Sequence, residues 1–365
     1  MLSINNWLIN NLVCPISKLP LIRKKNYFLS NKGEIYPIIN NIPIMIPLTK
    51  KPNHISAYKS LSFVKKFKNK KIENDQYFLE TLSIGKLVLE TLSIGKLEKK
   101  LIYKKIEDLN NNKESDLKKN IAIVSELVGA TNGIAYRASI GDLNELPIPI
   151  LPQKIKQDLV KPILDIGCNW GRWSIACSNK KNIIIGIDPS LGAIIIASNL
   201  AKIYGVKFIG IVGDARFLPF KNNSVASIIS YSVIQHFSRK DVNLAVGEIN
   251  RVLKPKGFSA VQMPNKLGLR CLYHQIRRGF RDGKNFEVRY WSIRKLNEVF
   301  SRIGKTNFIT DCYLGIGLQD NDFKFMSFLG KIVLIISRFL KSVPFINSGK
   351  FILSDSIWVL SKKNN

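Results

Sequence analysis

The stretch PILDIGCNWGRWSIA, residues 162–176, decides the fold class of this 365-residue chain. A short apolar run ends near Asp165, Gly167 and Gly171 follow in a turn, and a helical pattern begins directly after them. A strand, a glycine turn and a helix in this order are typical of a βαβ unit, whose turn lets the backbone approach a ligand. The stretch therefore predicts the first strand of an α/β fold with a binding site at its carboxyl end.

The same alternation of apolar runs and helical patterns continues along the chain. Further apolar runs alternate with helical patterns, at NIIIGID (182–188), FIGIVGD (208–214), VASIISYS (225–232) and FSAVQM (258–263). Buried parallel strands read as nearly continuous apolar runs because helices cover both faces of the sheet. We therefore predict a Rossmann-like, doubly wound α/β sheet that is mostly parallel.

Three successive predicted strands end in an acid, namely Asp165, Asp188 and Asp214. Each acid alone has a plain interpretation as a helix or turn cap. Together at one edge they would repel a phosphate-bearing cofactor and attract a cationic one. A carboxylate at Asp188 can also accept hydrogen bonds from ribose hydroxyls. We therefore expect a cationic nucleoside ligand at this edge.

The order of four motifs resembles the class I S-adenosylmethionine-dependent methyltransferases, with a methyltransferase type 11-like domain. ILDIGCNWG resembles their D-x-G-x-G-x-G loop, GIDPS their ribose strand, GDARFLPF their adenine strand and RVLKPKGF the turn before their fifth strand. The resemblance implies a seven-stranded sheet with S-adenosylmethionine as cofactor, although Asn169 replaces the middle glycine. The implied cofactor-binding residues are Asp165, Gly167, Cys168, Asn169, Gly171, Asp188, Pro189, Asp214, Ala215 and Ser232.

The segment after the fourth predicted strand, SYSVIQHF, lies where the family places side chains between cofactor and acceptor. Tyr231 and His236 are the catalytic candidates, with Gln235 beside them, and His236 is the candidate general base because its ordinary pKa is near neutrality. A base is optional in an in-line methyl transfer, which depends mainly on geometry. The family's [DNS]-P-P-[YF] motif for DNA amino groups is absent here.

A basic and aromatic connection, HQIRRGFRDGKNFEVRYW (274–291), follows the fifth predicted strand. Its arginines, Arg277, Arg278, Arg281 and Arg289, could pair with an anionic substrate while Tyr290 and Trp291 stack on a ring. Alternatively, it is a solvated face whose aromatic pair anchors the next helix in the core. Both interpretations stay open at this point.

The front of the chain, residues 8–48, resembles a degenerate zinc-ribbon-like module of methyltransferase activators, through LVCPISKLPL and EIYPIINNIPIMI. Ser17 replaces the second cysteine, and one thiolate cannot build a four-ligand zinc site. We predict a metal-free module held by packing of Tyr36, Ile38, Ile42 and Ile44. The predicted division is residues 1–48 for the module, 49–158 for a helical linker that includes the repeat at 79–98, and 159–365 for a methyltransferase domain with a C-terminal helical insertion.

The net charge of +30 is dispersed, because residues 1–160, 161–265 and 266–365 carry +11, +8 and +11. A dispersed excess is a weak nucleic-acid footprint. Five cysteines without C-x-x-C spacing, and a start that does not read as a secretory signal, predict a reducing, cytoplasmic location. Residues 326–345 are too interrupted by cations to span a bilayer; their helical spacing fits core packing, which we favour, or a membrane surface.

The function expected from these features is methyl transfer from S-adenosylmethionine to an oxygen or nitrogen of a small or lipid-linked metabolite. One alternative is an RNA methyltransferase, for example one acting on tRNA, which the charge favours. Another is a catalytically silent scaffold that binds S-adenosylmethionine, because a fold alone does not guarantee activity. Peripheral membrane contact is compatible with the first expectation, and no metal is expected.

Overall fold

The structure is a computed structural model of the chain. It describes residues 6–68, 145–178, 183–343 and 353–365, with isolated positions between 104 and 125. The repeat at 79–98 and most of the linker predicted for 49–158 lie outside the described residues. The domain boundaries given above therefore remain predictions.

A seven-stranded sheet forms the centre of the molecule, with strand order β10-β11-β9-β8-β5-β6-β7. Strands β5 to β9 pair in parallel, whereas β11 runs antiparallel to both β9 and β10. The mostly parallel doubly wound sheet expected from the sequence is thus confirmed. The strands are β5 (Ile163–Ile166), β6 (Ile183–Asp188), β7 (Lys207–Val212), β8 (Val225–Ser230), β9 (Leu253–Pro264), β10 (Gly304–Cys312) and β11 (Ser356–Lys363).

The strand order reverses at β5, which pairs with β6 on one side and with β8 on the other. The connections from β5 to β6 and from β8 to β9 leave in opposite directions from this point, and open α/β sheets bind ligands at the carboxyl edge of such a reversal. The acidic strand ends and the segment after β8 meet at this edge.

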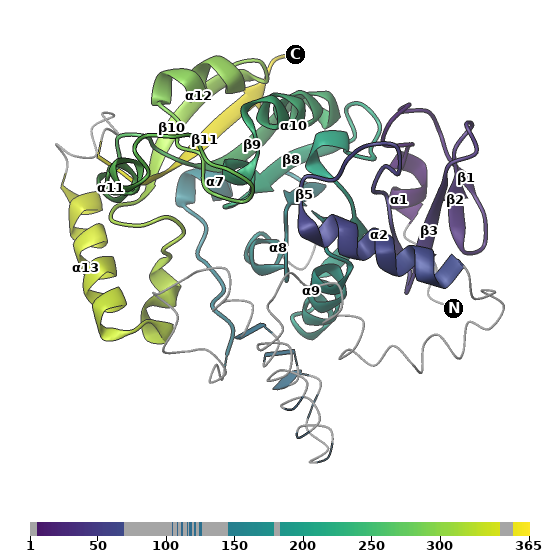
Figure 1. Cartoon of the computed structure of the whole chain (residues 1–365), viewed down its shortest axis with the longest axis horizontal. Coiled ribbons are helices and arrows are strands. Elements are labelled where there is room, and N and C mark those ends of the chain that lie inside the picture. The colour runs from purple at the N-terminus through teal and green to yellow at the C-terminus, as the bar shows by residue number, and fades with distance from the viewer. Residues whose placement is uncertain are drawn as a thin grey trace.

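Helices cover both faces of the sheet (Figure 1). The helix α9 is apolar around most of its circumference and packs against β6 and β7, whereas α10 and α12 pack on the other face in a second core cluster. Serine caps begin these three helices, at Ser190, Ser238 and Ser292. The helices here are α7 (Gln153–Asp158), α8 (Arg172–Ala176), α9 (Leu191–Ile203), α10 (Arg239–Val252) and α12 (Ile293–Phe300), with 3-10 turns η2 (Ala215–Phe217), η3 (Ile234–His236) and η4 (Asp320–Phe325).

A small antiparallel sheet precedes the large one, as expected. Asn40 and Asn41 adopt left-handed backbone angles in the turn between β3 and β4, a conformation that asparagine tolerates. The backbone N–H of Met45 donates to the carbonyl of Val212 at 2.6 Å, so the small sheet docks on the edge strand β7. The elements are α1 (Asn6–Asn11), β1 (Ile22–Arg23), β2 (Tyr27–Leu29), β3 (Ile35–Ile39), β4 (Ile42–Pro43) and α2 (Ile55–Lys68).

The packing of this module differs from that of an independent unit. Tyr36 and Met45 belong to the same core cluster as β5 and β6, and Ile42 and Ile44 join the cluster that contains α9. The four residues predicted to hold the module are buried or half-buried, as Tyr36, Ile38, Ile42 and Ile44. These residues pack against the large domain, and the module thereby covers β7, which would otherwise be an exposed edge strand.

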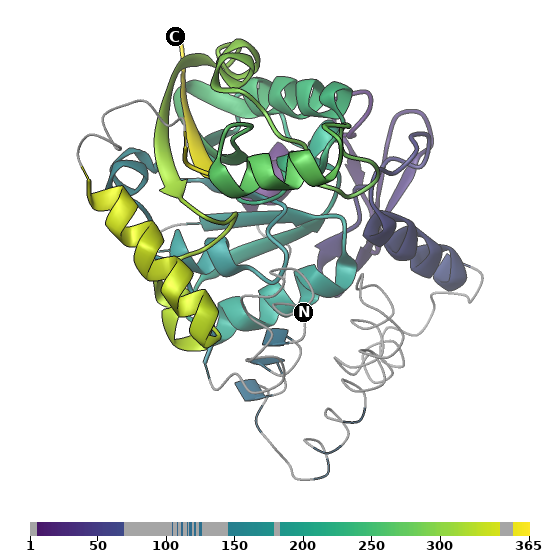
Figure 2. The ribbon, with the colours of Figure 1, turned by 60° about the vertical axis from the view of Figure 1, so that its left-hand side comes forward.

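The helix α13 (Phe328–Ser342) forms where helical spacing predicted it, but it does not bury its apolar face in the core. Only Gly330, Leu334 and Ser337 are buried along it, and Phe328 and Leu329 are 77% and 72% exposed. Figure 2 shows α13 lying along the outside of the molecule. Its inner face is narrow, with Leu334 between the small residues Gly330 and Ser337, and the bulky residues on the other side face outward. Within the described residues, no helix is long and apolar enough to cross a membrane.

A buried ion pair ties the start of α8 to the distant turn η4. The Arg172 guanidinium pairs with Asp322, and both side chains are nearly inaccessible to solvent. The Arg172 Nε also donates to the carbonyl of Pro147 at 2.7 Å. One residue therefore joins three segments that are far apart in the sequence.

The neighbouring acids of η4 provide a matched test of this ion pair. Asp322→Asn removes the charge of a fully buried partner of the Arg172 guanidinium, so we expect the free energy of unfolding to fall by about 3–5 kcal/mol. Asp320→Asn removes an exposed pair with Arg338 and should cost no more than about 1 kcal/mol. Urea unfolding of both variants measures the difference. Equal losses would contradict a central role for Arg172 and Asp322.

Candidate functional site

The turn between β5 and α8 has the backbone conformation that its sequence requires. Gly167, Asn169 and Gly171 all have positive φ angles, of 72°, 47° and 87°. A Cβ atom at Gly167 would collide with Val233, and one at Gly171 would lie 3.2 Å from the Cβ atom of Ala197. Asparagine is the side chain that best tolerates the left-handed region after glycine. Asn169, which replaces the middle glycine of the family pattern, is therefore compatible with the backbone conformation of this turn.

Asp188, at the end of β6, joins this turn to the start of α9. Its Oδ2 accepts the backbone N–H of Asn169 at 3.0 Å, and its Oδ1 accepts that of Ser190 at 2.9 Å. Burial raises the pKa of Asp188 to about 6. A carboxylate offers about four acceptor positions, so two remain for a ligand's hydroxyl groups.

Asp165 is fully buried beneath the same turn. Its Oδ2 accepts a hydrogen bond from the Ser174 hydroxyl of α8 at 2.7 Å. Burial, with a smaller contribution from the charge of Asp188, raises the pKa of Asp165 to about 7. Cys168 is buried beside these acids, and burial raises the pKa of its thiol. Two adjacent carboxylates whose ionised forms are disfavoured make a site that a cation would stabilise.

Asp214 lies at the end of β7 but is more heavily engaged than the sequence indicated. It caps η2 by accepting the backbone N–H of Arg216 at 2.9 Å, and it pairs with the Arg216 guanidinium at 2.7 Å. Arg216 also contacts Asp241 and donates to the carbonyl of Lys51. Asp214 therefore holds the wall of the site, and the neighbouring Ala215 is buried there. A contact from Asp214 to an adenine amine stays a prediction.

The helix α2 reaches this edge from the segment that the sequence analysis left without chemistry. The Ser60 hydroxyl donates to the carbonyl of Pro189 at 2.8 Å and accepts the backbone N–H of Leu191 at 3.0 Å. Ser60 is fully buried, as is Ala57 one turn earlier. Figure 1 shows α2 crossing in front of the large sheet near α9. A serine in a Lys-rich stretch gives no sequence signal for this contact.

His236 is held by an aromatic stack at the end of η3. Its ring stacks on Phe286 with centroids 3.9 Å apart, and Phe286 also contacts the ring of His54, which precedes α2. The Nδ1 atom of His236 lies 2.7 Å from the carbonyl of Phe286, so Nδ1 carries the proton and Nε2 keeps its lone pair. Burial lowers the pKa of His236 to about 4. The imidazole is therefore neutral at pH 7.

Gln235 links His236 to Ser232, which has a left-handed φ of 60°. Its Nε2 atom donates to the Ser232 hydroxyl at 2.7 Å and lies 3.2 Å from Nε2 of His236. Among the described residues, no donor reaches the buried Oε1 atom of Gln235. A buried acceptor without a donor is costly, so this oxygen is suited to receive an N–H or O–H from a ligand.

Tyr231 lies in a hydrogen-bond network that the sequence analysis did not find. Its hydroxyl donates to Asp311 Oδ2 at 2.7 Å and accepts from Gln319 Nε2 at 2.6 Å. Its ring packs between Trp173 and Trp358. Burial and the Asp311 charge hold the pKa of Tyr231 far above its ordinary value. The hydroxyl is therefore neutral and committed to buried partners.

The same network continues back to the turn after β8. Asp311 also accepts from the Ser356 hydroxyl at 2.7 Å, and Ser356 accepts from Gln262 Nε2 at 2.6 Å. Gln262 Oε1 in turn accepts the backbone N–H of Ser232 at 2.8 Å. Single polar residues inside apolar strands give little sequence signal, because their partners come from other strands. Gln262 and Asp311 are therefore positioning residues that only the structure reveals.

The connection over residues 274–291 places its residues in different environments. Tyr290 and Trp291 are buried, which agrees with the anchoring interpretation. Arg289 is also buried and donates to the carbonyl of His236 at 2.5 Å, whereas Arg281 forms an exposed pair with Glu287. Arg289 thus supports the turn that carries His236.

In the N-terminal module, Cys14 is buried and contacts protein groups. Its thiol lies 3.3 Å from Glu34 Oε2 and 3.4 Å from the Tyr36 hydroxyl, and the backbone N–H of Ser17 points at its sulfur. In the part of the chain that the structure describes, no three His, Cys, Asp or Glu side chains gather as a metal site.

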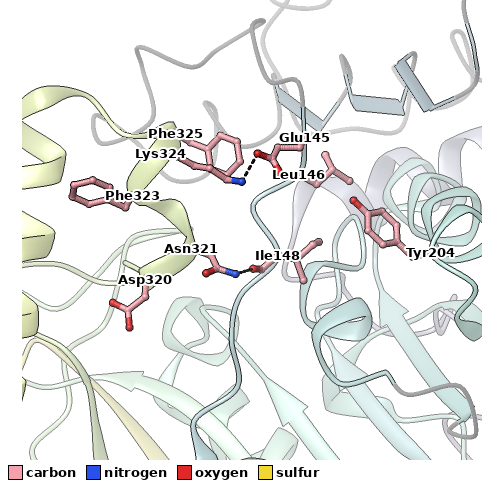
Figure 3. Close-up of a pocket in the computed structure, with 9 residues that line it drawn as sticks. All are labelled: Glu145, Leu146, Ile148, Tyr204, Asp320, Asn321, Phe323, Lys324 and Phe325. Carbon is pink, nitrogen blue, oxygen red and sulfur yellow. Dashed lines mark hydrogen bonds and ion pairs between the residues drawn. The ribbon is translucent and has the colours of Figure 1, made fainter.

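A cavity of about 490 Å³ lies apart from the strand ends (Figure 3). Asn321 donates to the carbonyl of Ile148 across it, and Lys324 pairs with Glu145 at its rim. Figure 3 shows Tyr204 on the α9 side and Phe323 on the η4 side. None of the cofactor residues expected from the sequence lines this cavity.

Comparison with known proteins supports the assignment of the central segment. A family model described as a methyltransferase domain matches residues 163–257, from β5 into β9. An uncharacterized protein of Methanocaldococcus jannaschii is 33% identical over 141 residues, which are 37% of this chain and 51% of that protein. The uncharacterized methyltransferase YcgJ of Bacillus subtilis is 36% identical over 96 residues, 26% of this chain and 37% of the relative. The chain therefore spans about half, or less, of these curated relatives.

A crystal structure of a SAM-dependent methyltransferase from Methanosarcina mazei aligns with 59% of this chain and 99% of its own, at 17% identity and a TM-score of 0.42. Residues 163–257 match a methyltransferase domain and lie on a sheet of the class I, Rossmann-like type. S-adenosylmethionine is the methyl donor of this class. The glycine turn and the disfavoured charges of Asp165 and Asp188 fit that cationic group.

The turn geometry yields a paired prediction at Asn169. Asn169→Ala places a plain L side chain at φ 47°, so we expect a loss of about 1 kcal/mol in unfolding free energy. Asn169→Gly should be nearly neutral because glycine adopts this conformation readily. Thermal or urea unfolding distinguishes them, and equal stability of the two variants would show that Asn169 is not constrained.

The raised pKa of Asp165 predicts a pH dependence. In the folded protein Asp165 binds its proton more tightly than in the unfolded chain. The free energy of unfolding without cofactor should therefore decrease as pH rises from about 4 to about 7. Asp165→Asn should flatten this decrease and stabilise the protein at pH 7.5 by about 1–4 kcal/mol. Urea unfolding at pH 5 and pH 7.5 measures both effects, with the exposed Asp282→Asn as control. A wild-type slope in Asp165→Asn would refute the assignment.

Proposed function

We propose that the protein transfers a methyl group from S-adenosylmethionine to an oxygen or nitrogen of a small or lipid-linked acceptor. The observation that carries this proposal is the meeting of Asp165, Asp188 and the left-handed glycine turn inside the matched domain. Two disfavoured carboxylates are suited to the sulfonium and ammonium charges of this cofactor, and unsuited to a dinucleotide phosphate.

One set of residues binds the cofactor, and a second set contacts the acceptor. S-adenosylmethionine supplies an electrophilic methyl group when bound. Asp188 holds the ribose hydroxyls with its two remaining acceptor positions, and Asp165 holds the turn through Ser174. Ser60 and the rest of α2 keep water from the ribose side.

On the acceptor side, Gln235 Oε1 has no donor among the described residues, and His236 Nε2 lies 3.2 Å from the side-chain nitrogen of Gln235. Gln235 Oε1 accepts an N–H that a nitrogen acceptor keeps through the reaction, whereas an oxygen acceptor directs its single O–H proton to His236 Nε2 as the methyl group leaves sulfur for oxygen. His236 Nε2, neutral at pH 7, takes the proton as the new bond forms. Tyr231, fixed between Asp311 and Gln319, shapes the wall beside them.

A calorimetric titration tests cofactor binding. S-adenosylmethionine and S-adenosylhomocysteine should both bind, and Asp188→Ala should weaken S-adenosylmethionine at least tenfold, because the ribose loses its acceptor. Glu298→Ala, at an exposed position of α12, should leave affinity unchanged. No binding of either compound would refute the proposal.

Activity is tested with methyl-labelled cofactor and an extract separated into RNA, lipid and small-molecule pools. Label in the lipid or small-molecule pool supports the proposal. Label in RNA, with binding that weakens steeply as salt rises, would support the RNA alternative instead. Cofactor binding without any labelled product would indicate a silent scaffold. If His236→Ala keeps full turnover, His236 is not the base.

A further inference from the structure

Two helices at the same end of the molecule present apolar side chains to solvent. On α13, six bulky residues lie on one face at helical spacing and are 38–77% exposed: Phe328, Leu329, Ile332, Ile335, Ile336 and Phe339. On α11 (Leu269–Arg277), three lie on one face and are 43–57% exposed: Leu269, Tyr273 and Ile276. Soluble globular helices have the reverse pattern, with the apolar face toward the core. We call these nine residues the apolar face.

Both helices flank one turn after β10. The backbone N–H of Tyr313 donates to Ser337 of α13 at 2.9 Å, and Arg270 of α11 donates to the carbonyl of Leu314 at 3.3 Å. Asp355 binds the N–H groups of both Cys271 and Leu314. Figure 1 places α11 and α13 on the same side of the molecule, opposite the N-terminal module. The two helices that carry the apolar face therefore lie on the same side of the molecule and are tied to the same turn.

The charged residues of the two helices are all cationic. α13 carries Lys331, Arg338 and Lys341, and α11 carries Arg270 and Arg277, without an acid in either helix. Exposed apolar side chains bordered by cations match a bilayer whose headgroups are anionic, because the apolar groups enter the interface and the cations contact phosphates. A second copy of this chain would bring like charges together.

We propose that the apolar face docks the protein on the surface of an anionic lipid bilayer. The turn that both helices flank is followed by Gln319, whose side chain donates to the hydroxyl of Tyr231. Docking on this face brings this end of the domain, with Gln319 and Tyr231, toward the membrane. Of the two proposed kinds of acceptor, small and lipid-linked, docking on a membrane favours the lipid-linked one. This inference about the acceptor rests on the proposed methyl transfer.

Vesicle sedimentation without cofactor tests the docking by itself. The full chain should sediment with vesicles of phosphatidylglycerol and phosphatidylcholine, and bind pure phosphatidylcholine at least tenfold more weakly. The variant Phe328→Ser, Leu329→Ser, Phe339→Ser should lose at least tenfold affinity for anionic vesicles. Its exposed positions make a folding defect unexpected, and circular dichroism checks this.

A matched control replaces exposed apolar residues elsewhere, as Ile22→Ser, Ile203→Ser and Leu244→Ser, and should bind vesicles like the wild type. If the α13 variant and the control bind equally well, dispersed charge rather than the apolar face holds the protein, and the inference is wrong. A concentration-dependent dimer that only the α13 variant abolishes would show that a second copy covers the face.

The two proposals fail separately. Cofactor titration of the same preparations reports on the methyltransferase site, whereas sedimentation reports on the apolar face. Vesicle binding that survives in Asp188→Ala, with cofactor affinity lost, supports docking independently of the activity. Wild-type cofactor affinity without any vesicle binding overturns the docking and leaves the proposed function intact.

Discussion

The site depends on one buried carboxylate that holds two backbone segments together. Asp188 accepts the N–H groups of Asn169 and Ser190, so the turn after β5 and the first turn of α9 keep a fixed distance. Because both donors are backbone groups, the contact survives changes in neighbouring side chains. The left-handed angles of Gly167, Asn169 and Gly171 then direct the turn around the space above β5 and β6.

A second constraint is the polar network beneath the acceptor side. Ser232, Gln262, Ser356, Asp311 and Tyr231 form a continuous chain of hydrogen bonds in which each donor has an acceptor. In a low-dielectric interior such a chain is rigid, because breaking one link leaves a buried group unsatisfied. It fixes the turn after β8, which carries Gln235 and His236, the two residues that we propose to contact the acceptor.

The third element is the cover over the cofactor edge. Ser60 joins α2 to the segment after β6. His54 and His236 both contact the ring of Phe286. Residues from the N-terminal third, the centre and the C-terminal third thus meet within one aromatic and polar cluster. The apolar face lies on α11 and α13, which flank the turn after β10, and Gln319 beyond that turn contacts Tyr231.

The sequence alone determined the parallel sheet, the three acidic strand ends and the glycine turn, because each is encoded by contiguous residues with local conformational preferences. It also predicted the β3–β4 hairpin and the helix α13. The tertiary structure alone decided that the bulky residues of α13 face outward, that Asp214 is engaged by Arg216, that Asp311 and Gln319 bind Tyr231, and that Ser60 binds the segment after β6. Edge strand β10 mixes polar and apolar residues and gave no clear signal. Local sequence patterns specify helices and strands. Burial and hydrogen-bond partners depend on which distant segments pack together, and a single polar residue does not indicate in the sequence which segment that is.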